Sequence, residues 1–391
     1  MRIGVVMNLI RKGRSQGTIN LIKKRFREAR DKRQPLEFPT RKIPRELLQQ
    51  LLVVCGKVDR HDAGTYKEKV EEIGADFVEV RAKNWTEVRD HIRLSFREGQ
   101  HAAILLIGTS EQLPSHPLKY QDSTAYTDWF FQDVDGDLVP EVPVGRVFGS
   151  PETVLGHLDP DIIDSDIAVI FDSEPGRSDR HLVALTKLGF HVEVLERFEP
   201  EDADLLAASE FVLQFSDGKY TRRIHGCPEA WLSHNSVILS YKQANQIPFK
   251  GYPVVFSEAC STAQEGPLLR AFLERRACYI GAPLDTLNNP RPFEDWRECA
   301  YADGWKFGFL DLLDSYDTIG QVKVNVDREI FENLSGWIKE CVRKLAVFGA
   351  TKIHYDETLS AVEWNLFGNP MRISTRGPKA AFTPDRIVVD T

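Results

Sequence analysis

With 391 residues, of which 42% are hydrophobic and 28% charged, the chain is long enough to bury a substantial core and has the composition of an ordinary soluble globular protein. That length suits two or three domains, or one large α/β unit made of two fused halves. No stretch approaches the roughly 20 apolar residues of a membrane span, and the N-terminus offers no small-residue site for signal-peptide cleavage. These features argue against a membrane-spanning protein and predict a cytoplasmic one.

The charge is unevenly distributed along the chain. Residues 1–50 contain 14 Lys and Arg against 4 Asp and Glu, a local charge of +10, which leaves −18 for the remainder because the whole chain carries −8. A basic extension over residues 1–48 could bind nucleic acid or an anionic membrane, or fold back on the acidic body. A solvated helix face around residues 19–30 would explain the same charges without any partner.

Apolar runs typical of buried strands alternate with segments of helical periodicity. In chain order, we expect strands at residues 51–55, 102–108, 167–171, 211–215, 254–257 and 277–281, and helices at 65–73, 86–98, 180–188, 266–275 and 328–348. Strands that are apolar on both faces and alternate with helices predict a mostly parallel sheet with helices on each side. In such sheets, functional side chains gather in loops at the carboxyl ends of the strands.

The turn-forming residues 159–166 mark the expected junction between two halves. We therefore expect an N-terminal α/β subdomain at residues 49–163, a catalytic subdomain at 164–375 and a C-terminal tail at 376–391. No GxGxxG or GxxxxGK[ST] phosphate loop, HExxH motif or GxSxG elbow accompanies the strands. The six cysteines lie far apart without a CxxC pair, which predicts reduced thiols and argues against a zinc or redox site.

The segment 254–283 (VVFSEACSTAQEGPLLRAFLERRACYIGAP) carries the strongest chemical signal, because Cys260 directly follows an apolar strand. A thiol at the carboxyl end of a buried strand lies at the exposed edge of the sheet, where backbone N–H groups of the next turn favour a thiolate and an oxyanion. Since an unperturbed thiol has a pKa of about 8.5, activation requires a nearby histidine. A cysteine that only packs in the core is the alternative interpretation.

A histidine follows the preceding apolar strand at the sequence Ile224, His225, Gly226. The glycine lets a substrate backbone approach closely and can offer its own N–H. By itself, His225 would fit a surface histidine. However, one strand is followed by His-Gly, and a strand one strand–helix unit later is followed by Cys260. This order predicts a Cys-His pair.

Four landmarks occur in order along the chain: an apolar strand ending in glycine at 105–108, the run FQDVDGDLVPEVPVGRV at 131–147, the pair of His225 and Cys260, and WNLFGNPMR at 364–372. Together they resemble the gingipain family of cysteine peptidases, whose fold relatives include caspases, clostripain and separase. The last landmark has Asn369 where the family usually has Asp. The resemblance spans about residues 100–372 and implies a caspase-like α/β/α sandwich, with a smaller N-terminal subdomain ahead of the catalytic one.

The resemblance also implies roles for two acidic residues after the strand 167–171. Glu174 matches the family's Glu that orients the catalytic His, and Asp179 matches its Asp at the base of the S1 pocket. A carboxylate behind an imidazole fixes the tautomer of the ring, and one in a pocket selects a basic side chain, Arg above all. A solvated acidic loop is the alternative for both residues.

One departure from the family pattern concerns the histidine. In gingipains the His-Gly follows its strand almost at once, whereas residues 216–224 intervene here. Asp217 could therefore occupy the histidine's place, and the chain would then be a catalytically inactive caspase-like binding or regulatory module. We favour His225 because its spacing to Trp231 suits the family, and His234 is a further alternative.

Two further expectations concern charged segments. The intervening residues Lys219, Arg222 and Arg223, or the N-terminal extension, could occupy an acidic S1 pocket as an internal inhibitor or be cut in self-processing. The carboxylates Asp133, Asp135, Asp137 and Glu141 have the alternating spacing of calcium loops, although the Glu at the twelfth EF-hand position is missing and the flanking prolines also fit a plain turn. Such calcium would be structural, and catalysis requires no cofactor.

The expected function is that of a cysteine endopeptidase cleaving after Arg or Lys. Cys260 would be the nucleophile, His225 the acid and base, and Glu174 the group that orients His225, with N–H groups near Gly226 and Cys260 holding the oxyanion. The expected partners are peptide or protein substrates and, because a cytoplasmic endopeptidase needs restraint, an activating protein. Nucleic acid stays open as a partner of the basic extension.

Overall fold

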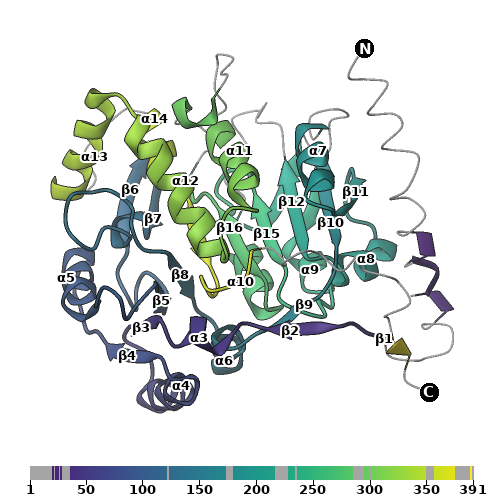
Figure 1. The fold of residues 1–391 in the computed structure, drawn as a ribbon, viewed down its shortest axis with the longest axis horizontal. Coiled ribbons are helices and arrows are strands. Elements are labelled where there is room, and N and C mark those ends of the chain that lie inside the picture. Colours follow the sequence, from purple (N-terminus) through teal and green to yellow (C-terminus); the bar gives the residue numbers. More distant parts are fainter. Residues whose placement is uncertain are drawn as a thin grey trace.

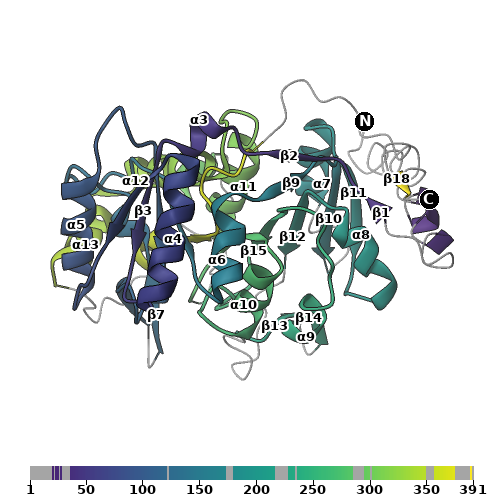
Figure 2. The same ribbon diagram turned by 90° about the horizontal axis from the view of Figure 1, so that it is seen from below.

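The computed structural model describes residues 20–21, 23–25, 27–28, 36–120, 123–172, 179–215, 228–233, 236–284, 295–299, 302–348, 356–374 and 388–389. A ten-stranded sheet runs through the molecule, and helices cover both of its faces (Figure 1, Figure 2). Within the described residues, no helix combines the length and apolar character needed to cross a membrane.

The sheet has the strand order β11-β10-β12-β15-β16-β17-β8-β5-β3-β4. The first half of the chain supplies a parallel set: β3 (Leu51–Cys55), β4 (Asp76–Glu79), β5 (Ala103–Ile107) and β8 (Val144–Val147). The second half supplies another: β10 (Ile167–Asp172), β11 (His191–Leu195), β12 (Phe211–Phe215), β15 (Val254–Ser257) and β16 (Cys278–Gly281). The prediction of a mixed α/β fold with a mostly parallel sheet is confirmed.

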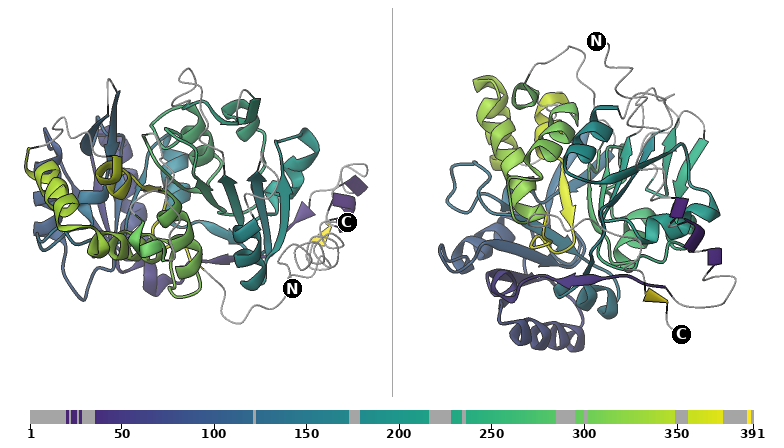
Figure 3. Two further views of the ribbon diagram at one scale, coloured as in Figure 1. Left: turned by 90° about the horizontal axis from the view of Figure 1, so that it is seen from above. Right: turned by 45° about the vertical axis from the view of Figure 1, so that its right-hand side comes forward.

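A single short strand joins the two halves. β17 (Asn365–Phe367) pairs antiparallel with β16 and meets β8 at one residue pair, Phe367 with Arg146. It appears in yellow between the strands of the two halves in the right-hand view of Figure 3. The close approach explains Gly145, because a Cβ at this position would collide with the carbonyl oxygen of Gly368.

The remaining elements surround the sheet. The α-helices are α3 (Arg45–Leu48), α4 (Arg60–Ile73), α5 (Trp85–Ser95), α6 (Pro151–Leu158), α7 (Asp179–Lys187), α8 (Ala203–Ala207), α9 (Tyr241–Ala244), α10 (Pro267–Glu274), α11 (Ala302–Leu312), α12 (Ile319–Asn333), α13 (Gly336–Phe348) and α14 (Asp356–Val362), and the 3₁₀ turns are η1 (Trp129–Phe131), η2 (Pro200–Asp202) and η3 (Trp296–Glu298). Two-stranded pairs join β1 (Leu36–Glu37) with β18 (Val388–Val389), β2 (Thr40–Lys42) with β9 (Asp161–Ile163), β6 (His116–Tyr120) with β7 (Ser123–Thr127), and β13 (Ala230–Ser233) with β14 (Ser236–Ser240).

Alternate residues of β15 show how the sheet divides the hydrophobic core. Phe256 stacks on Trp305 of α11, with ring centroids 5.7 Å apart. Its neighbour Val255 belongs to a second buried cluster that contains Phe272 of α10. Because successive side chains of a strand point to opposite faces, α11 and α10 cover opposite faces of the sheet, which is why β15 reads as a continuous apolar run.

The expectation of one helix over residues 328–348 is wrong, since α12 ends at Asn333 and α13 begins at Gly336. Leu334 adopts an extended conformation with φ −60° and ψ 146°. The Ser335 hydroxyl then accepts a hydrogen bond from Ile338 N at 3.3 Å, which satisfies one of the unpaired N–H groups at the start of α13. The apolar periodicity continues across this break and therefore conceals it.

The described part of the basic extension pairs with acidic residues of the second half. Lys23 Nζ lies 3.4 Å from a Glu193 carboxylate oxygen and 3.5 Å from one of Asp202. In β2, the Arg41 guanidinium lies 3.2 Å from the buried Glu210 carboxylate. Both cations therefore pair with carboxylates of the protein's own second half in this structure.

Candidate functional site

Two neighbouring strands end side by side at the carboxyl edge of the second half. β12 and β15 are parallel, and Gln214 of β12 lies opposite Ser257 of β15. Cys260 follows the end of β15 by three residues, so it lies in the turn just beyond this edge. This is the position that the sequence predicts for a nucleophile.

The buried amide of Gln214 holds the start of the Cys260 turn. Its Oε1 accepts hydrogen bonds from Ala259 N at 3.0 Å and from the Ser257 hydroxyl at 3.1 Å. The Thr262 hydroxyl donates to the Ala259 carbonyl at 2.8 Å, on the other side of Cys260. The backbone on both sides of the thiol is therefore fixed by buried polar groups.

The turn also has an unusual backbone conformation immediately after Cys260. Ser261 has a φ of 58°, in the left-handed region that side chains other than glycine rarely adopt. Its N–H donates to the Leu284 carbonyl at 2.9 Å, beyond the end of β16, which holds it in this conformation. Backbone strain of this kind costs of order 1–3 kcal/mol and persists only where the surroundings impose it.

Cys260 itself is almost covered, with 6% of its surface exposed. Gly281, at the end of β16, allows the turn to pack closely, because a Cβ there would come within 3.3 Å of the Ala263 Cβ. The side chain of Cys260 is therefore tightly enclosed within this turn.

The other predicted catalytic residues lie outside the described residues: Glu174, His225 and Gly226, together with the alternatives Asp217 and His234. β12 ends at Phe215, so the segment that contains His225 starts from the edge beside the Cys260 turn. Asp179 is the first residue of α7, and its side chain is not described. The roles of these residues stay predictions.

A buried ion pair near Cys260 was not foreseen from the sequence. Glu258 lies 2.8 Å from the Lys306 Nζ of α11, and the two side chains are 5% and 11% exposed. Glu258 immediately precedes the turn, so the pair anchors the end of β15 to the helix layer. The sequence does show a charged residue, Glu258, at the end of an apolar strand. It does not show the partner of Glu258, because Lys306 is 48 positions away.

The acidic loop predicted to bind calcium is only partly assembled as expected. Oxygen atoms of Asp133, Asp135 and Glu141 lie within 4.8 Å of one another. The fourth predicted ligand, Asp137, lies outside this group, and its Oδ1 accepts the N–H of Val139 at 2.7 Å in a local turn. Burial raises the pKa of both Asp133 and Glu141.

A cation already contacts this acidic group. The Arg93 guanidinium lies 2.8 Å from Asp133 Oδ2. The loop is thus partly neutralised by the protein itself, and calcium at Asp133 and Asp135 stays a prediction.

We expect Gln214→Ala to lower the free energy of unfolding by about 1 kcal/mol, because the buried N–H of Ala259 and the hydroxyl of Ser257 lose their common acceptor and keep only the Ser257 and Thr262 hydroxyls as partners. Urea denaturation measures this change. The control is Gln246→Ala at an exposed position, which should change the free energy by less than about 0.5 kcal/mol. Equal effects of the two substitutions would show that Gln214 does not hold the turn.

Comparison with known proteins identified no related family or sequence. The chain matches no protein-family model, and a search of curated proteins finds no similar sequence.

Proposed function

We propose that the chain is a cysteine endopeptidase of the gingipain type that cleaves peptides after Arg or Lys. The observation that supports this most is the pairing of β12 with β15. One strand leads into the segment that contains His225, and the other leads into the turn that carries Cys260. Adjacent parallel strands deliver their following residues to the same edge of a sheet, where a thiol and an imidazole can share one substrate.

The proposed reaction is acyl transfer. The Cys260 thiolate attacks the scissile carbonyl carbon, and backbone N–H groups near Gly226 and Cys260 stabilise the resulting oxyanion. His225 donates a proton to the leaving amine as the C–N bond breaks, which leaves a thioester. It then takes a proton from the water that hydrolyses the thioester and regenerates the thiolate.

Two carboxylates complete the proposed site. Glu174 orients the imidazole of His225, and Asp179 binds a basic P1 side chain. The start of α7 at Asp179 follows β10, the strand next to β12, which is compatible with a place near the same edge.

The proposed fold is a caspase-like α/β/α sandwich, with an N-terminal subdomain at 49–163 and a catalytic subdomain at 164–375. Two parallel sets of strands joined through β17 support this arrangement. A cytoplasmic endopeptidase would also need an activating protein partner or self-processing to restrain it, and a structural calcium ion at the acidic loop belongs to the same proposal.

Affinity labelling tests the proposed function directly. A peptidyl-arginine chloromethyl ketone should alkylate Cys260, which peptide mapping by mass spectrometry identifies, and fluorogenic substrates with Arg or Lys at P1 should be cut faster than those with Asp or Leu. Prior alkylation should abolish cleavage. If folded protein is neither labelled at Cys260 nor active on any substrate, the inactive binding module becomes the better interpretation.

A further inference from the structure

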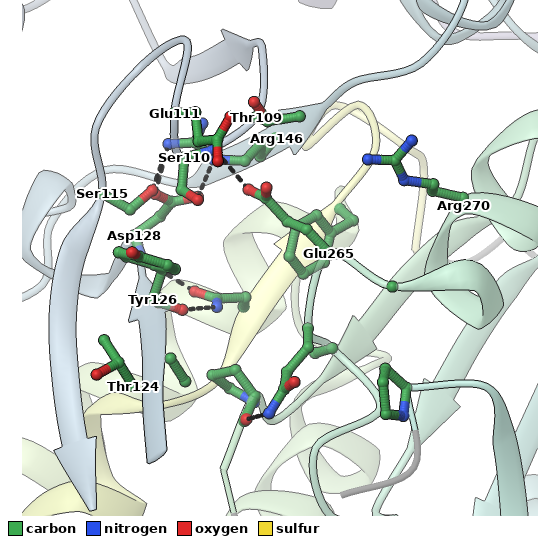
Figure 4. A pocket seen from close by; sticks show the side chains of 18 residues that line it. Thr109, Ser110, Glu111, Ser115, Thr124, Tyr126, Asp128, Arg146, Glu265 and Arg270 are labelled. Carbon is green, nitrogen blue, oxygen red and sulfur yellow. Dashed lines mark hydrogen bonds and ion pairs between the residues drawn. The ribbon is translucent and has the colours of Figure 1, made fainter. Parts of the chain in front are cut away.

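A polar crevice of about 400 Å³ lies where loops of the two halves meet, within the size range of ligand pockets (Figure 4). One wall comes from the first half of the chain, with Ser110 and Glu111 after β5 and Tyr126 in β7. The opposite wall comes from the second half and includes Glu265, five residues after Cys260. The crevice therefore adjoins the turn of the candidate nucleophile.

Hydrogen bonds fix the wall formed by the second half. Ser110 N donates to Glu265 Oε1 at 2.6 Å, across the gap between the two halves. The neighbouring Gln264 donates from Nε2 to the Pro283 carbonyl at 2.9 Å. The half-buried carboxylate of Glu265 therefore has a defined position, beside Ser110 and Arg146 in Figure 4.

Arg146 has no N–H group left for an anionic ligand. Its Nε donates to Asp128 Oδ2 at 2.7 Å, and its Nη2 donates to Asp128 Oδ1 at 2.8 Å and to the Ser115 hydroxyl at 2.7 Å. Its Nη1 donates to the carbonyl oxygens of Gly108 at 2.7 Å and Leu113 at 3.1 Å. All five donors are used within the protein, and the charge of Arg146 is matched by that of Asp128.

The remaining charges leave Glu265 as the enclosed one. Glu111 and Arg270 also line the crevice, but both are exposed and of opposite sign, and the guanidinium carbon of Arg270 lies 5.9 Å from the centroid of the Phe148 ring. The half-buried carboxylate of Glu265 therefore favours a cation. Tyr126, 44% exposed, offers an aromatic face against which a long cationic side chain can lie.

We propose that this crevice binds the ammonium or guanidinium group of a Lys or Arg side chain in a peptide substrate, with Glu265 as the counter-ion. The inference rests on the proposed function, because it takes the cation to be part of the peptide that reaches Cys260. The crevice is lined by residues of β17 and β8, which lie on one side of β15 in the strand order. Asp179 follows β10, which lies on the other side of β15. Glu265 is thus a recognition residue separate from the predicted S1 carboxylate.

The pH dependence of binding follows from the position of Glu265. Burial raises the pKa of this carboxyl group, against the opposing influence of Arg146 and of the Ser110 N–H. A protonated carboxyl group cannot pair with a cation, so affinity falls as the pH drops through this raised pKa. The loss occurs at a higher pH than an exposed Glu would give.

Calorimetric titration of the Cys260→Ala protein with Nα-acetyl-arginine methylamide tests the inference without any turnover. Glu265→Gln in this background should weaken binding about tenfold or more, because it removes the charge but keeps an oxygen for Ser110 N. Glu68→Gln, at an exposed position on α4, should leave the affinity unchanged. The neutral acetyl-norleucine methylamide should bind no better to the parent than to Glu265→Gln.

Three outcomes would overturn the crevice inference. They are no binding of the arginine amide, equal binding by the parent and Glu265→Gln, or a loss of affinity that follows Asp179→Asn alone. Thermal unfolding of each variant shows whether it is folded, and Glu265→Asp, which keeps the charge but withdraws it, should give an intermediate affinity. Because the titration needs no cleavage, its failure is distinct from a failure to label Cys260 in the wild type.

Discussion

Cys260→Ala is expected to reduce cleavage of arginyl substrates by a factor of about 10³ or more, because it removes the atom that forms the thioester. The same change removes one sulfur atom from a side chain that is 6% exposed, so the free energy of unfolding should fall by no more than about 1–2 kcal/mol. Substrate turnover and urea denaturation of the same preparation separate the two effects.

The matched control for this substitution is Cys341→Ala. Cys341 is 5% exposed on α13 and therefore has similar burial without a place in the proposed chemistry. It should lose a similar amount of stability and keep full activity. Substantial turnover by purified Cys260→Ala would contradict the assignment of the nucleophile.

Asp327→Ala is expected to lower the free energy of unfolding by about 3–5 kcal/mol, because it leaves the ammonium group of Lys323 buried without its counter-ion. The two side chains form an ion pair one turn apart on α12 and are 0% and 3% exposed. Asp327 also accepts hydrogen bonds from Trp305 Nε1 at 2.8 Å and Gln132 Nε2 at 3.0 Å. Its loss would therefore leave donor groups from α11, α12 and the loop after η1 without this shared acceptor.

Urea denaturation compares this variant with Glu72→Ala, which breaks the exposed pair of Glu72 and Lys69 on α4. The exposed pair should contribute less than about 1 kcal/mol. The double replacement Lys323→Met with Asp327→Leu should recover most of the lost stability, since it removes both buried charges. If Asp327→Ala and Glu72→Ala cost the same, the buried network does not stabilise the fold.

The proposed recognition of basic peptides has a consequence for specificity. Asp179 and Glu265 would contact different parts of a substrate, and a peptide with two basic residues could use both. A peptide with one basic residue would lack one of these charge-assisted hydrogen bonds. Its binding free energy would therefore be less favourable by about 1.5–3 kcal/mol.

Several structural features could be read directly from the sequence. Six strands were predicted where the structure has them, because strands buried on both faces leave continuous apolar runs such as those of β5 and β10. The position of Cys260 at a strand end followed from the same reasoning. The break between α12 and α13 could not be found in this way, since apolar periodicity continues across Leu334.

By itself, the sequence determined the class of fold and the position of Cys260 just beyond the end of a strand, because burial imposes a local pattern on each element. Only the tertiary structure decided that Gln214 holds the Cys260 turn, that Lys306 reaches Glu258, and that Glu265 meets Ser110, 155 positions away. These contacts depend on which strands become neighbours and on how the two halves meet at β17. Pairings across such distances leave no periodic signal in the chain, so they could be recognised only once the sheet was assembled.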